Sequence, residues 1–208
     1  MDFNLFLSKI NYLKQAHLGG LEAHFRLAPE IRLQYNSEKI AARNPKKAAV
    51  LALFYPNSEN DTCFLLTQRA SYKGTHSAQI SFPGGKIETS DKNLEETALR
   101  ETFEEVGIKK EKISVIREIT DVYIPPSNFL ATPFIGYSNQ KPILDINHEV
   151  DHTFDVLLED LLDDSNISSI NITTSYAKNI DVPCFKLNNY IVWGATAMIL
   201  NEIKELLK

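Results

Sequence analysis

The chain has 208 residues, of which 43% are hydrophobic, so we expect one folded domain with a substantial core rather than a disordered chain. A net charge of -5 and an isoelectric point near 5.6 exclude the broad basic surface of proteins that bind nucleic acid polymers. No run of about eighteen apolar residues is present, so no membrane partner is expected through a spanning helix.

The N-terminal residues carry an acidic second position and no basic start, so we do not expect a signal peptide. Cys63 and Cys184 lie far apart in apolar stretches. We expect both to be buried free thiols, and a cytoplasmic location is the simplest inference.

The first part of the chain predicts a helix followed by an irregular arm. Apolar residues recur at helical spacing over residues 3–16, which predicts an amphipathic helix that packs on the main body. Residues 29–47 are polar and contain asparagine and proline, so we expect no regular element there. We therefore expect residues 1–46 to form an N-terminal helix and arm packed on the core, and residues 47–208 to form the main domain.

From residue 48 the pattern alternates between strands and helices. Residues 48–55 and 62–69 predict a hairpin, and residues 79–82 predict a short strand that leads into Pro83, Gly84 and Gly85. Asn93 and Glu96 are spaced as a capping box for a helix over 93–106, which Gly107 ends. Further strands are expected within 113–124, 131–137 and 152–158, a short helix over 157–164, a hairpin within 168–187 and a terminal helix over 190–207. This order predicts an α/β fold, an α/β/α sandwich with a mixed sheet.

Three glutamates share one face of the helix over 93–106. Glu101, Glu104 and Glu105 fall within an arc of roughly 100°, while Leu99 and Phe103 fall on the opposite, predicted core side together with Val106. Two adjacent glutamates on a helix, taken alone, usually mark only a solvated helix face. Crowded carboxylates repel one another unless a cation neutralises them, and the cation that suits them is a hard divalent metal, Mg²⁺ or Mn²⁺.

The segment GGKIETSDKNLEETALRETFEEVGI resembles the Nudix box, the signature of enzymes that hydrolyse nucleoside diphosphates linked to another moiety. Eight residues separate Asp91 from Arg100, one more than in the common form of the box, which puts a metal role of Asp91 in doubt. The apolar position after Arg100 and Glu101 is also displaced, from Thr102 to Phe103.

The segment before the box, LLTQRASYKGTHSAQISFPGG, is similar to a pattern of the coenzyme A pyrophosphatase branch of this family. The matching positions are Leu65, Leu66, Thr67, Arg69, His76, Phe82, Pro83, Gly84 and Gly85. Ala70 and Ala78 depart from it, where serine and glycine are usual. The resemblance covers roughly residues 45–200.

Glu101 and Glu105, one helical turn apart, are the predicted primary metal ligands, and Glu104 is a predicted further ligand. The resemblance implies that the backbone carbonyl near Gly85 also binds the metal. Arg100 is expected to orient an acid rather than to touch substrate. The general base is predicted to be either Glu104 or Glu149, with no preference between them.

Arg69, Lys73, His76 and Lys86 are predicted to meet the phosphates of the substrate, although a solvated role for either lysine and a structural role for His76 are the alternatives. Tyr190 and Trp193 are expected to pack at the start of the terminal helix, with stacking on adenine as the alternative, and the loop over 123–129 is expected to border the cleft.

The resemblance implies metal-dependent hydrolysis of the diphosphate of coenzyme A or an acyl-coenzyme A. The products would be 4'-phosphopantetheine, or its acyl form, and adenosine 3',5'-bisphosphate. The alternatives are the same reaction on ADP-ribose or a dinucleoside polyphosphate, and a non-catalytic nucleotide-sensing module. The expected partner is this small-molecule substrate, and homodimers are common in the wider family, although no segment of the sequence predicts an interface.

Overall fold

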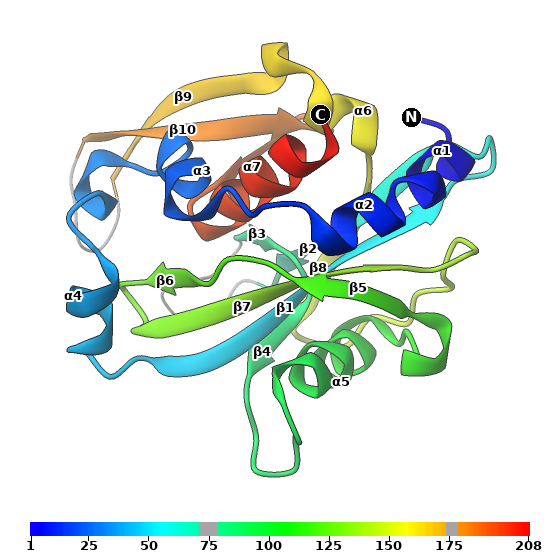
Figure 1. Ribbon diagram of the computed structural model, residues 1–208, viewed down its shortest axis with the longest axis horizontal. Helices are drawn as coiled ribbons and strands as arrows, with labels where there is room; N and C mark the ends of the chain where they lie inside the picture. Colours follow the sequence, from blue (N-terminus) through cyan, green and yellow to red (C-terminus); the bar gives the residue numbers. More distant parts are fainter. Residues whose placement is uncertain (71–78, 174–178) are drawn as a thin grey trace.

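A computed structural model describes residues 1–70, 79–173 and 179–208 of the protein (Figure 1). The helices are α1 (Phe3–Ser8), α2 (Ile10–Gln15), α3 (Gly20–Arg26), α4 (Ser37–Ala41), α5 (Leu94–Val106), α6 (Leu158–Leu162) and α7 (Ala195–Leu207). Single turns of 3-10 helix also occur within these ranges, namely η1 (Glu30–Arg32), η2 (Lys110–Lys112) and η3 (Asp164–Asn166).

The larger sheet is mixed. Its strands are β1 (Lys46–Pro56), β2 (Thr62–Arg69), β3 (Ile80–Ser81), β4 (Gly84–Lys86), β5 (Ser114–Glu118), β6 (Val122–Ile124), β7 (Phe129–Tyr137) and β8 (Val150–Leu157). The main path runs β3-β2-β1-β7-β5, while β4 pairs with β1, β6 with β7 and β8 with β2. The pairing of β1 with β7 is parallel and the other pairings are antiparallel.

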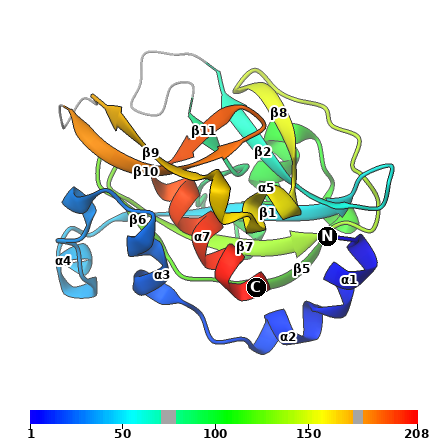
Figure 2. The same cartoon turned by 90° about the horizontal axis from the view of Figure 1, so that it is seen from above.

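A smaller antiparallel sheet joins β9 (Ile167–Ile172), β10 (Ile180–Leu187) and β11 (Tyr190–Trp193) in the order β11-β10-β9. Figure 2 shows it beside α7. The predicted hairpin within 168–187 therefore corresponds to β9 and β10. The terminal helix is shorter than predicted, because Tyr190 and Trp193 belong to β11 and the chain turns at Gly194 (φ 69°) before α7 begins.

The alternation of side chains along β1 produces two cores, one on each face of the larger sheet. Ala49, Leu51 and Leu53 face α5, whereas Ala52 and Phe54 face the layer that contains the N-terminal helices and α7 (Figure 1). Successive residues of a strand point to opposite faces, so one apolar strand serves both cores. The predicted α/β/α sandwich with a mixed sheet is confirmed.

The N-terminal segment packs on the same core as the main domain. The predicted helix over 3–16 is present as two short helices, α1 and α2, separated at Lys9. Phe3, Phe6 and Leu13 are buried in the core that also contains α7. The predicted irregular arm over 29–47 contains η1 and α4, and α3 between the helix and the arm was not predicted.

A buried polar cluster ties α3 to α7. The carboxylate of Glu202 in α7 lies 3.2 Å from His24 Nε2 in α3, and it accepts hydrogen bonds from the Gly20 N–H and from Thr120. Burial alone would raise the pKa of Glu202, but these hydrogen bonds outweigh it and lower the pKa. The cluster therefore holds an ionised carboxylate inside the core.

Cys63 and Cys184 are both buried and free, as predicted. None of the helices in the three described ranges combines the length and the apolar character needed to cross a membrane.

Candidate active site

The three acids of the predicted box are carried by α5, whose ends are defined as the sequence predicts. The side chain of Asn93 accepts a hydrogen bond from the Glu96 N–H at 2.8 Å, and Gly107 closes the helix in the left-handed conformation. The Glu96 carboxylate accepts from the Lys92 N–H rather than from Asn93, so only one half of the capping box forms.

The division of α5 into an acid face and a core face is wrong at two positions. Glu105 is only 4% exposed, and Phe103, which was predicted to face the core, is 49% exposed. Val106 is buried as predicted, and Ala98 and Thr102, which were not predicted to face the core, are buried with it. Thr102 is tolerated there because its hydroxyl donates to the Ala98 carbonyl at 2.7 Å.

The two glycines lie directly against the acids of α5. They belong to β4, a strand that was predicted only as a turn, in which Gly84 and Gly85 pair with Val50 and Ala49 of β1. The Gly84 N–H donates to Glu105 Oε2 at 3.1 Å. A β-carbon on Gly85 would lie 2.5 Å from Glu101 Cδ, so the absence of a side chain at Gly85 is what allows Glu101 to approach the backbone.

Burial raises the pKa of both predicted primary ligands. For Glu105, burial raises the pKa to about 7, although the Gly84 N–H and Arg69 act in the opposite direction. For Glu101, burial also raises the pKa, and the neighbouring Arg100 lowers it in part. Glu104 and Glu149 add repulsion that raises the pKa of Glu101 further. Each of the two carboxylates would therefore be stabilised in its charged form by an added cation.

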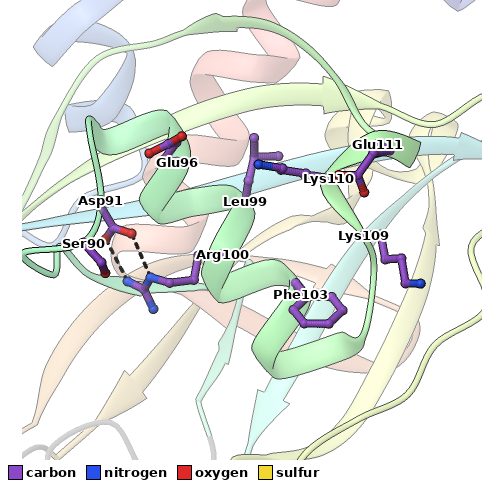
Figure 3. Close-up of a pocket in the computed structure, with 9 residues that line it drawn as sticks. All are labelled: Ser90, Asp91, Glu96, Leu99, Arg100, Phe103, Lys109, Lys110 and Glu111. Atoms are coloured by element: carbon purple, nitrogen blue, oxygen red, sulfur yellow. Dashed lines mark hydrogen bonds and ion pairs between the residues drawn. The ribbon is translucent and has the colours of Figure 1, made fainter.

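Arg100 connects the acids to the loop that precedes α5. Its guanidinium donates to Glu101 Oε1 and Glu104 Oε2, both at 3.0 Å, and to the Lys86 carbonyl. Asp91 holds the same guanidinium through two hydrogen bonds at 2.9 and 3.0 Å, which Figure 3 shows. These bonds lower the pKa of Asp91 to about 2. Asp91 thus fixes the arginine that contacts the acids.

Glu149, one of the two predicted bases, reaches the site from the loop before β8. It lies beside Arg69, the last residue of β2, with 3.0 Å between Glu149 Oε2 and Arg69 Nη2. Arg69 Nη1 lies 3.9 Å from Glu105 Oε1. The backbone reinforces this contact, because the Ala70 N–H donates to the Glu149 carbonyl at 2.8 Å. Arg69 therefore stands between a carboxylate of α5 and a carboxylate more than forty positions later in the chain.

These groups line one cavity of about 490 Å³. The structure brings together the predicted residues Glu101, Glu104, Glu105, Glu149, Arg100, Arg69, Gly85 and Lys86 along its wall. Two further predicted substrate contacts, Lys73 and His76, lie outside the described residues. The loop over 123–129 borders the cavity as expected, through Ile124, Pro126, Ser127 and Phe129.

Trp193 was predicted to pack at the start of the terminal helix, with stacking on adenine as the alternative; it is half-buried in β11 and lines the cavity. Tyr190 packs on Phe154, with ring centroids 4.3 Å apart. Arg32 also lines the cavity, which was not predicted, because it lies in the arm that was expected to be irregular.

A second cavity of about 470 Å³ lies on the other side of α5 (Figure 3). Leu99, Phe103 and the lysines Lys109 and Lys110 contribute to its wall, and Arg100 borders both cavities. Glu101, Glu104 and Glu105 do not line it. The chemistry of the acids therefore belongs to the first cavity.

The donor set of the first cavity fits a hard divalent cation. Within residues 1–70, 79–173 and 179–208, no three acidic, histidine or cysteine side chains already converge on one centre. Arg100 engages Glu101 and Glu104 instead, and Arg69 engages Glu149. The donors are nevertheless all carboxylate oxygens, and two of them, on Glu101 and Glu105, have raised pKa values. Oxygen donors of this kind are the ones that Mg²⁺ and Mn²⁺ take.

Comparisons with known proteins point to one family. The NUDIX domain family model matches residues 45–170. The mitochondrial Nudix hydrolase 15 of Arabidopsis thaliana is 34% identical over 164 residues, which are 75% of this chain and 56% of that protein. An uncharacterised Nudix hydrolase of Yersinia pestis, NudL, is 29% identical over 171 residues, 82% of this chain and 83% of that protein. The chain spans about half the length of the plant relatives that it matches.

Two solved structures share the fold. The NUDIX domain of NrtR from Shewanella oneidensis, complexed with ADP ribose, has a TM-score of 0.52 and 16% identity, and the match covers 86% of this chain and 97% of that one. A MutT/nudix family protein from Enterococcus faecalis has a TM-score of 0.53 and 15% identity, with 97% and 74% covered. The family model covers more than half of the chain and includes the glycine turn and the acids of α5, so this protein belongs to the Nudix family.

Proposed function

We propose that the protein hydrolyses the diphosphate bond of coenzyme A or an acyl-coenzyme A in a metal-dependent reaction. The products are adenosine 3',5'-bisphosphate and 4'-phosphopantetheine or its acyl form. The observation that carries the proposal is the convergence of Glu101, Glu104, Glu105 and Glu149 on one cavity beside the glycines of β4.

Glu101 and Glu105 would hold the metal, with Glu104 and the backbone at Gly85 beside them. When bound, a divalent cation neutralises charge on the diphosphate and lowers the pKa of water. The chain itself supplies the position of the ligands. The Gly84 N–H holds Glu105, and Arg100, which Asp91 fixes, holds Glu101 and Glu104. Hydrolysis of a diphosphate depends mainly on such positioning and on charge stabilisation.

The general base is assigned to one of two carboxylates, Glu104 or Glu149. Each lines the cavity and each contacts an arginine, Glu104 at Arg100 and Glu149 at Arg69. A base must be ionised to accept the proton of water, so its removal flattens the acidic limb of the pH–rate profile. We expect one of Glu104→Gln and Glu149→Gln to lose this limb together with at least roughly 100-fold in kcat, and the other to keep it.

The choice of coenzyme A rests on the sequence pattern before the box and on where its residues lie. Leu65, Leu66 and Thr67 are buried in β2, where they support the fold. Arg69, at the end of the same strand, lines the cavity, and so does Phe82 before the glycines. Among the described residues of the pattern, Arg69, Gly84 and Gly85 line the cavity and lie beside acids of α5.

A substrate panel tests the proposal. Coenzyme A, acetyl-coenzyme A, ADP-ribose and a dinucleoside polyphosphate are incubated with Mg²⁺ or Mn²⁺ in ¹⁸O water, and the products are identified by mass spectrometry. We expect the highest kcat/KM with a coenzyme A substrate, and ¹⁸O in one of the two phosphate products. If ADP-ribose were hydrolysed as fast as coenzyme A or faster, ADP-ribose would replace coenzyme A as the proposed substrate. Tight nucleotide binding without metal-dependent product formation would favour a non-catalytic sensing module.

A further inference from the structure

The loop over residues 138–149, which joins β7 to β8, is hydrogen-bonded to the end of the helix that carries the acids. The Asp145 N–H donates to the Val106 carbonyl at 3.0 Å, and the Asn147 N–H donates to the Glu105 carbonyl at 3.1 Å. The last carbonyls of a helix have no partner within the helix, so the loop supplies donors that these acceptors need. The second bond attaches the loop to the backbone of a predicted metal ligand.

Asn147 also holds the backbone of Glu149. Its Oδ1 accepts from the Glu149 N–H at 2.8 Å, which is the turn that an asparagine side chain forms with the residue two positions on. The Glu149 carbonyl accepts from the Ala70 N–H at 2.8 Å, beside a shift in the register of β2 and β8 between Gln68 and Arg69. Both polar groups of the Glu149 main chain therefore have a partner, which fixes the direction of its side chain.

Asn147 thus links a predicted metal ligand to a predicted base. Its N–H is bonded to Glu105 and its side chain to Glu149, so one half-buried residue sets the separation of the two. Glu105 and Glu149 line the first cavity, whereas Asn147 does not. Any effect of Asn147 on the reaction must therefore act through the residues that it holds.

The placement of Glu104 and Glu149 suits different roles. Arg100 Nη1 donates both to Glu104 and to the predicted ligand Glu101, which groups Glu104 with the metal ligands of α5. Glu149 reaches the cavity from another element. A general base acts on the attacking water rather than on the cation, and it must lie within hydrogen-bond reach of that water. A carboxylate that approaches from outside α5 meets this requirement.

We propose that Asn147 is a positioning residue, which holds Glu149 at a set distance from Glu105 so that Glu149 acts as the general base. The inference rests on the proposed function and adds the choice of base and the residue that places it. Glu149 takes a proton from the attacking water, whose oxygen bonds to phosphorus while the bond from that phosphorus to the bridging oxygen breaks. The bridging oxygen leaves with the electron pair on the second phosphate. A displacement of ~1 Å in such a group can cost about 100-fold in rate.

The first test is Asn147→Ala, which removes the acceptor for the Glu149 N–H. We expect kcat to fall roughly 10- to 100-fold with KM nearly unchanged, because the base is misplaced while the substrate contacts remain. Asn147→Ser keeps an oxygen that forms the same turn more weakly, so it should recover part of the loss. A fall in KM and kcat together, or no recovery in Asn147→Ser, would contradict a positioning role.

The matched control is Asn57→Ala, in the turn between β1 and β2. Asn57 Oδ1 accepts from the Glu59 N–H at 2.9 Å, so the same kind of turn precedes a glutamate two positions on, and Asn57 does not line the cavity. We expect this variant to keep the kcat of the wild type. An equal fall of kcat in Asn57→Ala and Asn147→Ala would show a general effect of losing a turn, and would overturn the inference.

A double-mutant cycle tests whether Asn147 acts through Glu149. It combines Asn147→Ala with Glu149→Gln and uses the substrate of the panel that the wild type cleaves fastest, so it does not depend on coenzyme A. The double variant should have the kcat of Glu149→Gln alone.

Two results would overturn the inference and leave the metal-dependent hydrolysis intact. One is a double variant in which the two losses multiply, and the other is loss of the acidic limb of the pH–rate profile in Glu104→Gln instead of Glu149→Gln. A wild-type protein that cleaves none of the substrates would refute the proposed function together with this inference.

Discussion

Glu105→Gln should make the metal-free protein more stable at alkaline pH, although it removes a predicted metal ligand. Burial raises the pKa of Glu105 from 4.5 to about 7, so between these values the folded protein holds a proton that the unfolded chain has lost. Stability therefore falls as pH rises through this window. The shift corresponds to about 3 kcal/mol at pH 8, and glutamine avoids the loss while its amide oxygen still accepts from the Gly84 N–H.

The assay is urea denaturation in EDTA at pH 5, 6, 7 and 8. We expect the two proteins to differ least at pH 5, and Glu105→Gln to exceed the wild type by about 2 to 3 kcal/mol at pH 8. Glu104→Gln is the control, because the Glu104 side chain is 51% exposed and its removal should change the pH dependence little. Parallel curves for wild type and Glu105→Gln across this range would refute the account of Glu105.

Three further predictions concern single positions. Asp91→Asn should destabilise the protein by about 2 kcal/mol at pH 7, because the pKa of Asp91 is lowered from 3.8 to about 2 in the folded protein. The difference in stability between variant and wild type should fade as pH falls from about 4 to 2. Urea denaturation curves of the two proteins that coincide at pH 7 would contradict this prediction. Gly84→Ala should lower stability by more than about 2 kcal/mol, because the new β-carbon would lie 2.3 Å from the Ala49 carbonyl oxygen and φ at this position is 153°. A melting temperature equal to that of the wild type would contradict this prediction and show that the backbone at Gly84 adjusts to the methyl group. Cys63 should react slowly with a thiol reagent at pH 8, because burial raises its pKa to about 11, and rapid labelling of the native protein with mass spectrometric assignment to Cys63 would argue against burial.

Strands with strong alternation and helices with clear ends could be predicted from the sequence. β2 was expected at residues 62–69 and forms there, and Asn93 and Gly107 define α5 as predicted. The strand β11 was missed because a four-residue apolar run directly before α7 has no periodicity that separates it from a helix.

The site was predictable in composition but not in detail. The acids were located from the box, but the burial of Glu105 depends on the backbone of Gly84, which another element brings beside it. The role of Asp91 depends on how the longer loop folds back on Arg100. Arg32 could not be predicted, because its contacts with Tyr123 and Met198 join positions far apart in the chain. Helical spacing gives no information on such long-range contacts.

The central claim is that Glu101 and Glu105 hold the cation that the hydrolysis of coenzyme A requires. It is tested most directly by the turnover of Glu101→Gln and Glu105→Gln with coenzyme A at saturating Mg²⁺, with Arg26→Gln as a control, because Arg26 pairs with Glu205 outside the cavity. We expect kcat of both variants to fall by at least roughly 100-fold while their circular dichroism matches that of the wild type. Rates near wild type in both variants would contradict the assignment of these two carboxylates.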